Sequence, residues 1–407
     1  MSSITSSWKA LSLQPLRWFG LNGIASNFGS GLNYITMTWI LLSVNNSVSS
    51  LALLMMCFWG PTVFLGPICG VIADRYSRKG LLVMSNATRG VLLVLVALII
   101  TQHVLPWEIY ATAILLSIFG NFYGPTAFAY IREIVPVRQM LHANAIVAIS
   151  YELGNIAGMG CAGFLIAAFS SRIVLAISGL LFLLATWCLI LIKPLSLYTE
   201  EAPDIVKPRQ RRGFWFGLRG GLRYLSRRKS LRVLYYAQLL IMINFFTAPI
   251  LLAPYAKNIL HATASEFGLI EICLSVGVIL GGLTAPLLTE LWNFKILVFT
   301  QLTALTILFV LFGFTSTLWA ANVIYFLMGV TLAAWTLLIT KAQLHTHINF
   351  QARVQSVFNS AAAVLILLVY ILLDITGDLL PLSWLYGLEA MFTAIAVLLL
   401  WRHKEIL

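Results

Sequence analysis

Charged side chains are scarce in this chain, and so are histidine and cysteine. Asp, Glu, Lys and Arg together make up 10 % of the 407 residues, against about 25 % in ordinary globular proteins. The five cysteines are odd in number and lie in apolar stretches, so neither a disulfide framework nor a zinc cluster is indicated. The six histidines fall near expected loops or helix ends, and no ATP-binding phosphate loop occurs. We therefore expect no metal, no cofactor and no ATP-driven chemistry.

Apolar residues dominate instead, at 60 % of the chain, with a mean hydropathy of +0.92. A helix needs about 20 apolar residues to cross a bilayer. The chain is therefore predicted to be an all-α membrane protein without a large soluble domain. Its apolar runs predict twelve transmembrane helices, near 17–42, 50–73, 80–101, 107–131, 140–169, 173–192, 231–255, 263–289, 294–314, 317–341, 352–375 and 381–401.

The distribution of Lys and Arg predicts the orientation of these helices. With both termini in the cytoplasm, all of the 26 basic residues except Arg172 and Lys257 fall on the cytoplasmic side, as the positive-inside rule requires. The net charge of +12 is thereby explained without a nucleic-acid partner.

A long connection divides the chain into an N-terminal six-helix bundle (1–192), a cytoplasmic linker (193–230) and a C-terminal six-helix bundle (231–407). The end of the linker is amphipathic and predicts an interfacial helix on anionic lipid, with a regulatory or partner-binding role as the alternative. Its apolar and basic faces consist of Leu218, Leu222 and Leu225, and of Arg219, Arg223 and Arg227. Similar stretches at 136–146 and 349–359 indicate a parallel repeat of the two bundles, as in transporters with a central cavity.

The connection between the second and third helices carries a specific motif, GVIADRYSRKG at 70–80. It resembles the G-x-L-a-D-R-x-G-R-K signature of the major facilitator superfamily, with Ile72 and Ser77 as departures. The resemblance implies a gating loop. Its glycine would let the second helix pack closely on a neighbouring helix, and its aspartate would pair with basic side chains. The gating residues are Gly70, Asp74, Arg75, Arg78 and Lys79, together with Arg89 on the third helix.

Four further stretches, at 25–47, 83–93, 134–146 and 221–234, resemble the enterobactin exporter and macrolide efflux branch of that superfamily. The branch implies export of a siderophore or a drug-like molecule. Its third helix commonly opens with an Asp three residues before an Arg. The matching positions here are Asn86 and Arg89, so one cytoplasmic ion pair is absent.

The fifth predicted helix holds Gly154, Gly158, Gly160 and Gly163. Such spacing is typical of close helix packing. An antiporter-type glycine motif is the alternative, although the proline that usually accompanies it is absent.

Two acids deep in apolar helices are candidates for proton coupling, because a buried carboxyl can be held neutral and release its proton on hydration. They are Glu152, about twelve residues into the fifth helix, and Glu271, about eight residues into the eighth. A structural hydrogen-bonding role for Glu152 is the alternative, and Glu266 is expected at a wet rim. Amide and aromatic side chains near the middle of several helices predict a substrate cavity. These are Asn27, Asn33, Asn121, Tyr123, Tyr151, Asn155, Asn244, Trp335 and Asn359.

Taken together, the sequence predicts a monomeric secondary transporter of the bacterial inner membrane, not an enzyme. We expect it to export a small amphipathic organic molecule in exchange for protons by alternating access. The alternatives are a siderophore or metabolite uptake permease of the same fold, and a non-transporting scaffold or sensor.

Overall fold

The structure is a computed structural model of the 407-residue chain. It describes residues 14–406, apart from 74–75, 100–104, 136–139, 193–219, 221 and 347. Statements below refer to these residues.

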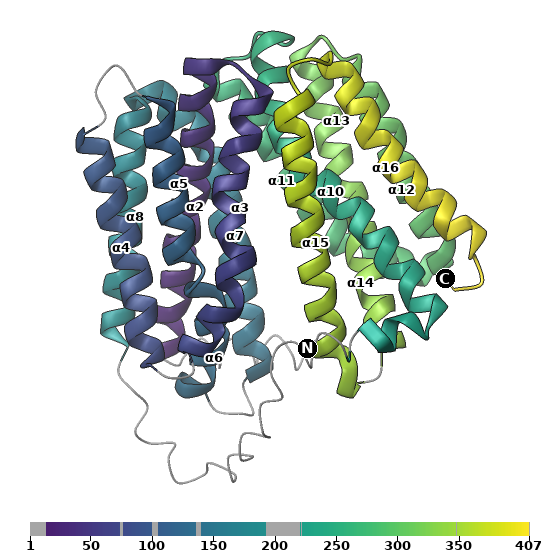
Figure 1. Cartoon of the computed structure of the whole chain (residues 1–407), viewed down its shortest axis with the longest axis horizontal. Helices are drawn as coiled ribbons and strands as arrows, with labels where there is room; N and C mark the ends of the chain where they lie inside the picture. Colours follow the sequence, from purple (N-terminus) through teal and green to yellow (C-terminus); the bar gives the residue numbers. More distant parts are fainter. Residues whose placement is uncertain are drawn as a thin grey trace. The chain divides into compact units, whose positions relative to one another are not determined.

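Every described regular element is a helix, and helices occupy all twelve of the predicted ranges (Figure 1). In the first half of the chain they are α2 (Gln14–Asn45), α3 (Val48–Ala73), α4 (Arg78–Ile99), α5 (Pro106–Gly120), α6 (Tyr123–Ile134), α7 (Met140–Phe169) and α8 (Ser171–Leu191). In the second half they are α10 (Lys229–Asn258), α11 (Ala264–Leu291), α12 (Phe294–Gly313), α13 (Leu318–Thr331), α14 (Ala333–His345), α15 (Ile348–Thr376) and α16 (Leu382–Arg402).

Among the described residues, nine spans are long and apolar enough to cross a membrane. The 32-residue helix α2 is not one of them, although it is long enough. The reason is that α2 carries several polar side chains, among them Asn22, Asn27 and Asn33, and these are buried. The hydropathy of α2 is therefore low because its amide side chains are buried against other parts of the protein.

The fourth and tenth predicted spans are each divided into two helices, which corrects the prediction of continuous helices at 107–131 and 317–341. At the first break, the Asn121 side chain donates to the carbonyl of Ser117 over 2.8 Å. At the second, the Thr331 hydroxyl donates to the carbonyl of Met328 over 2.7 Å. Side chains that bond to the preceding turn compete with the helix ladder and bend it. The breaks lie in corresponding spans of the two halves, in keeping with a parallel repeat.

The chain divides into two compact units, Met1–Val44 with Cys57–Arg211, and Asn45–Met56 with Arg212–Leu407. We call them the first and second units. The start of α3 thus clusters with the second unit, whereas the rest of that helix belongs to the first. Of the predicted linker, residues 193–219 and 221 lie outside the described part. Tyr224 and Leu225 follow, and they pack on the second unit's core.

Within each unit the third span packs on the sixth, as α4 on α8 and α12 on α16 (Figure 1). Glycines allow backbones to approach at several crossings, as small-residue interfaces do in membranes. A Cβ at Gly158 of α7 would lie 2.2 Å from the carbonyl oxygen of Phe28 in α2, and one at Gly154 would lie 2.5 Å from that of Ile24. The packing interpretation is confirmed at these two glycines.

Candidate functional site

A network of polar side chains joins α2, α4 and α6 inside the first unit. On α2, Asn22 and Ser26 are one helical turn apart and so share a face. The Asn22 amide donates to the Tyr123 hydroxyl over 2.7 Å, and the Asn86 amide donates to the Asn22 oxygen over 2.9 Å. The Ser26 hydroxyl donates to the Asn86 oxygen over 3.2 Å. Asn86 is therefore held by two neighbours on α2.

Arg89 is the charged member of this network. The sequence predicts Arg89 to be a gating residue on the cytoplasmic side. In the structure it lies at the middle of α4 and is 8 % exposed, so it is neither in the gating loop nor at the start of the helix. Its Nη2 donates to the Asn86 oxygen over 2.5 Å, and its Nε donates to the carbonyl of Ser85 over 3.2 Å. The guanidinium carbon lies 4.4 Å from the ring centre of Phe182 and 5.5 Å from that of Tyr123.

The neighbours of Arg89 that the structure describes are neutral. Among the side chains that the structure describes, no carboxylate forms an ion pair with Arg89, and Asn86 occupies the position where the related branch has an acid. Amide oxygens and aromatic faces offset part of the cost of burying a cation. Tyr151, which is 48 % exposed, interacts electrostatically with Arg89 and with Tyr123. Of the predicted cavity residues, Tyr123 thus contacts this cation, and Tyr151 interacts with it electrostatically.

The second unit contains a further buried acid, Glu389 on α16. It is not among the predicted proton-coupling residues. This residue is 3 % exposed. The Thr247 hydroxyl of α10 donates to its Oε1, and the Asn244 amide donates to its backbone carbonyl over 2.9 Å. Its Oε2 and the Asn244 oxygen have no hydrogen-bond partner among the described residues. Glu389 is the only acid in the apolar run 381–401. It therefore meets the criterion that selected Glu152, an acid deep in an apolar helix.

Glu271 on α11 is buried, with 1 % exposure, so the structure places this predicted acid inside the second unit. Both Glu271 and Glu389 are the eighth residue of their helices. At about 1.5 Å per residue, each lies roughly 12 Å from the start of its helix. Glu266 is partly exposed and caps α11, where its carboxylate accepts from the Thr263 amide over 2.8 Å. The side chain of Glu152 lies outside the described residues.

An aromatic cluster lies one turn from Glu389 along α16. Tyr386, Tyr255 and Phe312 have ring centres 4.8 to 5.1 Å apart. The Tyr255 hydroxyl donates to the carbonyls of Phe312 and Thr315, both over 2.7 Å. All three rings are buried inside the second unit.

The remaining predicted cavity residues have varied surroundings. In the first unit, Asn27 is buried and donates to the Gly23 carbonyl over 2.7 Å, whereas the Asn33 oxygen is buried without a partner among the described residues. Asn121 bonds to the end of α5, as described above. Asn155 lies where α7 crosses α2, and its carbonyl oxygen would be 2.5 Å from a Cβ at Gly31.

In the second unit, Asn244 lies at Glu389, but the other two predicted cavity residues do not join it. The Trp335 side chain packs on the hydrophobic core, with its ring centre 6.3 Å from that of Phe358. Asn359 is exposed on α15.

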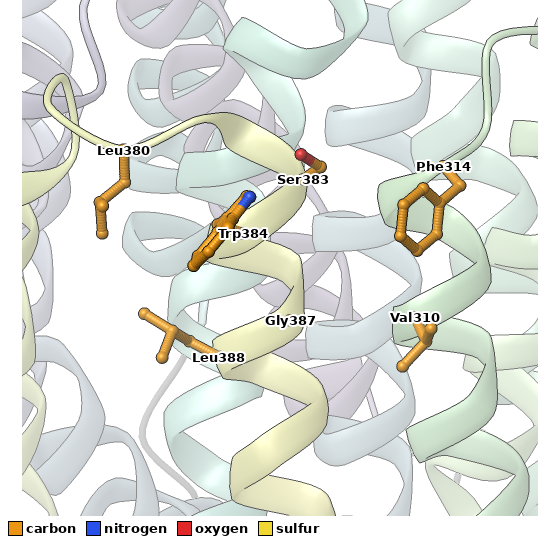
Figure 2. A pocket seen from close by; sticks show the side chains of 7 residues that line it. All are labelled: Val310, Phe314, Leu380, Ser383, Trp384, Gly387 and Leu388. Carbon is orange, nitrogen blue, oxygen red and sulfur yellow. The ribbon is translucent and has the colours of Figure 1, made fainter.

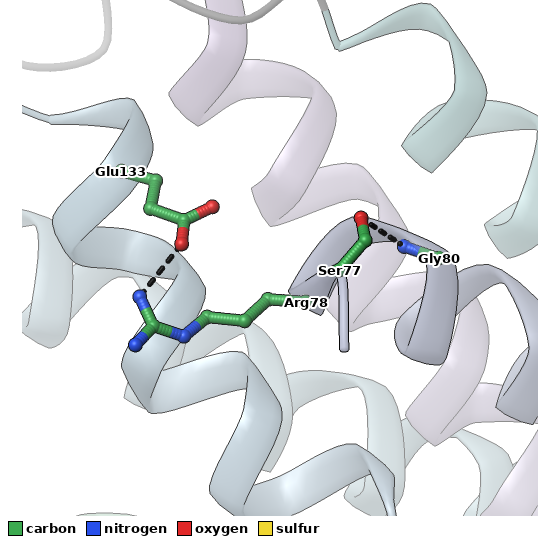
Figure 3. Close-up of polar contacts among 4 residues, drawn as sticks. All are labelled: Ser77, Arg78, Gly80 and Glu133. Carbon is green, nitrogen blue, oxygen red and sulfur yellow. Dashed lines mark hydrogen bonds and ion pairs between the residues drawn. The ribbon is translucent and has the colours of Figure 1, made fainter. Parts of the chain in front are cut away.

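The described part of the gating motif is bound to neighbouring helices of the first unit. Arg78 forms an ion pair with Glu133 of α6, with 2.6 Å between Nη1 and Oε1 (Figure 3). The Lys79 ammonium donates to the carbonyls of Ile190 and Ile192 over 2.9 and 2.6 Å, and so caps the end of α8. Gly70 lies in α3, and Asp74 and Arg75 lie outside the described residues.

A pocket of 430 Å³ lies beside α12 and α16 in the second unit (Figure 2). None of the predicted site residues lines it, and its lining has no ionisable group. It is therefore not the candidate site. The lining residues are Val310, Phe314, Leu380, Ser383, Trp384, Gly387 and Leu388.

The long apolar helices and buried ionisable groups define a polytopic α-helical membrane protein. The family model of the Major Facilitator Superfamily matches residues 19–370. The chain therefore belongs to the major facilitator superfamily of membrane transporters.

Curated relatives are the uncharacterized MFS-type transporters YfiS and YvqJ of Bacillus subtilis (strain 168). YfiS is 26 % identical over 203 residues, which are 50 % of this chain and 47 % of YfiS. YvqJ is 23 % identical over 258 residues, which are 62 % of this chain and 60 % of YvqJ. The matches thus span about half to three fifths of these relatives. Neither comparison confirms the enterobactin exporter and macrolide efflux branch.

Solved structures with the same fold cover nearly the whole chain. The nucleoside transporter NupG has a TM-score of 0.71 at 13 % identity, covering 96 % of this chain and 98 % of NupG. A bacterial homolog of the human lysosomal transporter Spinster, in an inward-facing and unoccupied conformation, has a TM-score of 0.65 at 13 % identity, covering 98 % of this chain and 96 % of that one. At this identity the likeness shows the fold alone.

Proposed function

We propose that this chain is a proton-coupled secondary transporter that exports a small amphipathic organic molecule by alternating access. The observation that supports proton coupling is the carboxyl of Glu389, buried inside the second unit with one oxygen unpartnered among the described residues. An ionised carboxylate in such surroundings costs several kcal/mol. Glu271, at the same distance from the start of its helix, is a second acid of this kind.

The proposed step is a proton exchange at the Glu389 carboxyl. When the site is dry, the neutral acid is favoured because desolvation penalises its charged form. When water reaches the site, the carboxyl releases its proton, and the Thr247 hydroxyl, which already bonds to Oε1, stabilises the carboxylate. Asn244 holds the backbone carbonyl of Glu389 and fixes the position of the acid.

The direction and the substrate subclass, siderophore or drug-like compound, belong to the same proposal. Uptake of a siderophore or metabolite is the alternative with the same chemistry, and a scaffold or sensor is the alternative without transport. Two buried acids favour transport, since a scaffold gains nothing from their cost.

We further propose a location in the bacterial inner membrane, with both termini cytoplasmic and anionic lipid at the 193–230 linker.

Transport by purified protein in sealed proteoliposomes tests this function. Ethidium, a macrolide and a catecholate siderophore serve as probes. An imposed pH gradient should drive accumulation of at least one probe, and a proton ionophore should abolish the accumulation. If all three probes move at the same rate with and without the gradient, or none moves, the proposal is wrong.

Variants assign the proton site. Glu389→Gln mimics the protonated acid, so it should still exchange substrate at equilibrium but lose gradient-driven accumulation. Glu271→Gln tests the second acid in the same way. Glu266→Gln is the matched control, because glutamine retains the helix cap at a partly exposed position. Full gradient-driven accumulation by both buried variants would contradict proton coupling through these acids.

A further inference from the structure

We propose that Arg89 binds the anionic group of the transported molecule, which is therefore an aromatic organic anion, a carboxylate or a sulfonate. The proposal rests on the proposed transport function and names its substrate class. It starts from the charge of the first unit: a buried cation lies at the middle of α4, and none of the described side chains around it supplies a carboxylate. Such a cation costs several kcal/mol unless an anion joins it.

The network around Arg89 holds the guanidinium without neutralising it. Asn86 is fixed by Asn22 and Ser26 and presents its oxygen to Nη2. A guanidinium has five N–H donors, and its bonds to Asn86 and Ser85 occupy two of them. Gly120 lies beside Nη1, where an added Cβ would be 3.7 Å away, and offers no side chain to accept from it. Donors thus remain for a carboxylate or sulfonate, which arginine binds through paired hydrogen bonds.

The aromatic residues around Arg89 indicate the rest of the ligand. The guanidinium carbon lies 4.4 Å from the ring centre of Phe182 and 5.5 Å from that of Tyr123, so the cation has an aromatic environment. The half-exposed Tyr151 interacts electrostatically with the same cation. A cation framed by aromatic rings suits an acid group on an aromatic ring.

Thermal stabilisation of the full-length protein in detergent tests the proposal without any ion gradient, so a failure of proton coupling does not affect the result. The probes are 2-naphthalenesulfonate, 2-naphthoate and the neutral 2-naphthalenesulfonamide. A ligand that binds the folded state raises the melting temperature with its concentration. We expect both anions to raise it and the sulfonamide to have no effect.

The decisive variant is Asn86→Asp. It places a carboxylate where the Asn86 oxygen already lies 2.5 Å from Nη2, and so neutralises Arg89 in place. The variant should fold, and its apparent affinity for both anions should fall at least tenfold. Arg89→Gln should also abolish the shift, and Arg89→Lys should retain part of it. Asn258→Asp adds the same charge at an exposed position and should respond as the parent protein does.

Three results would overturn the proposal. The first is an equal shift with the sulfonamide, which would indicate apolar binding alone. The second is an undiminished response to the anions in Asn86→Asp, because a purely structural cation would be stabilised by the new acid without losing a ligand. The third is the absence of any shift in the parent protein with both anions at millimolar concentration.

Discussion

The buried ionisable residues of the two units differ in kind: the first unit buries a base and the second unit buries acids. In the first unit a cation, Arg89, is surrounded by amides and rings. In the second unit two acids, Glu271 and Glu389, are buried, and Glu389 accepts a hydrogen bond from the Thr247 hydroxyl. The cation is permanent because arginine does not titrate in proteins. The acids can lose their charge, so they are suited to carry protons.

Sequence reasoning found the depth of only one of these three groups, Glu271. Glu271 was selected because it interrupts an apolar run, and Glu389 could have been found by the same rule. Arg89 was assigned to the cytoplasmic side from the Lys/Arg distribution and the family resemblance, whereas in the structure it lies at the middle of α4. The bonds among Asn22, Asn86 and Tyr123 join residues up to 101 positions apart, and no periodicity predicts which helices meet.

Lys79 provides a test at the residue scale. Because its ammonium donates to two carbonyls at the end of α8, Lys79→Met should lower the free energy of unfolding by about 1 kcal/mol, within the range for bonds to charged groups at a partly exposed site. The melting temperature measures the loss. The control is Lys295→Met, and an equal change in both variants would contradict the capping role.

At the scale of elements, most helix ends agree with the sequence prediction within a few residues, because apolar runs end at polar or turn residues. The breaks after Gly120 and after Thr331 were not predicted. A Gly-Asn pair marks the first in the sequence. At the second, the Thr331 hydroxyl bonds to its own helix, as threonines also do within unbroken helices such as α12, so no residue pattern marks that break.

The crossing of α11 with α13 allows a matched test of glycine packing. A Cβ at Gly281 would lie 2.4 Å from the Val330 carbonyl oxygen, whereas one at the adjacent Gly282 would meet nothing within 4 Å. Gly281→Ala should therefore destabilise the protein by about 1–3 kcal/mol through overpacking. Gly282→Ala should be neutral or slightly stabilising, since alanine is the better helix former. Melting temperatures of the two variants compare them, and similar values would contradict this packing.

The start of α3 is held by acids at the end of α15. Asp378 accepts from the Val48 amide over 2.8 Å and from the Ser47 hydroxyl over 2.5 Å, and so caps the helix. Asp378→Ala should cost about 1 kcal/mol, as loss of an N-cap does. Hydrogen exchange of the amides at 48–51 should then be about fivefold faster. Asp374→Ala is the control, because Asp374 accepts from the Ser49 hydroxyl and not from the backbone. Unchanged exchange in Asp378→Ala would refute the cap.

At the scale of the whole molecule, composition alone predicted an all-α membrane protein, since 60 % hydrophobic residues and 10 % charged residues leave no other class. The fold followed because length, span count and the loop motif agreed. Substrate and coupling ion could not be derived in this way. Those properties depend on which side chains face one another inside each unit.

Orientation in the membrane gives a prediction for the complete chain. The 193–230 segment is rich in Lys and Arg and should face the cytoplasm. Trypsin added to inside-out vesicles should cleave the chain there into two fragments of similar size. Trypsin added to right-side-out vesicles should leave that segment intact, and cleavage within it would overturn the predicted topology.

Proton movement driven by substrate tests the central claim most directly. Proteoliposomes that contain a pH-sensitive dye are prepared without a pH gradient, and a gradient of the transported probe is then applied. Coupling is reciprocal, so the substrate gradient alone should move protons in the opposite direction, with a signal that Glu389→Gln abolishes and Glu266→Gln retains. Substrate flux without any change of internal pH in the parent protein would contradict proton-coupled transport.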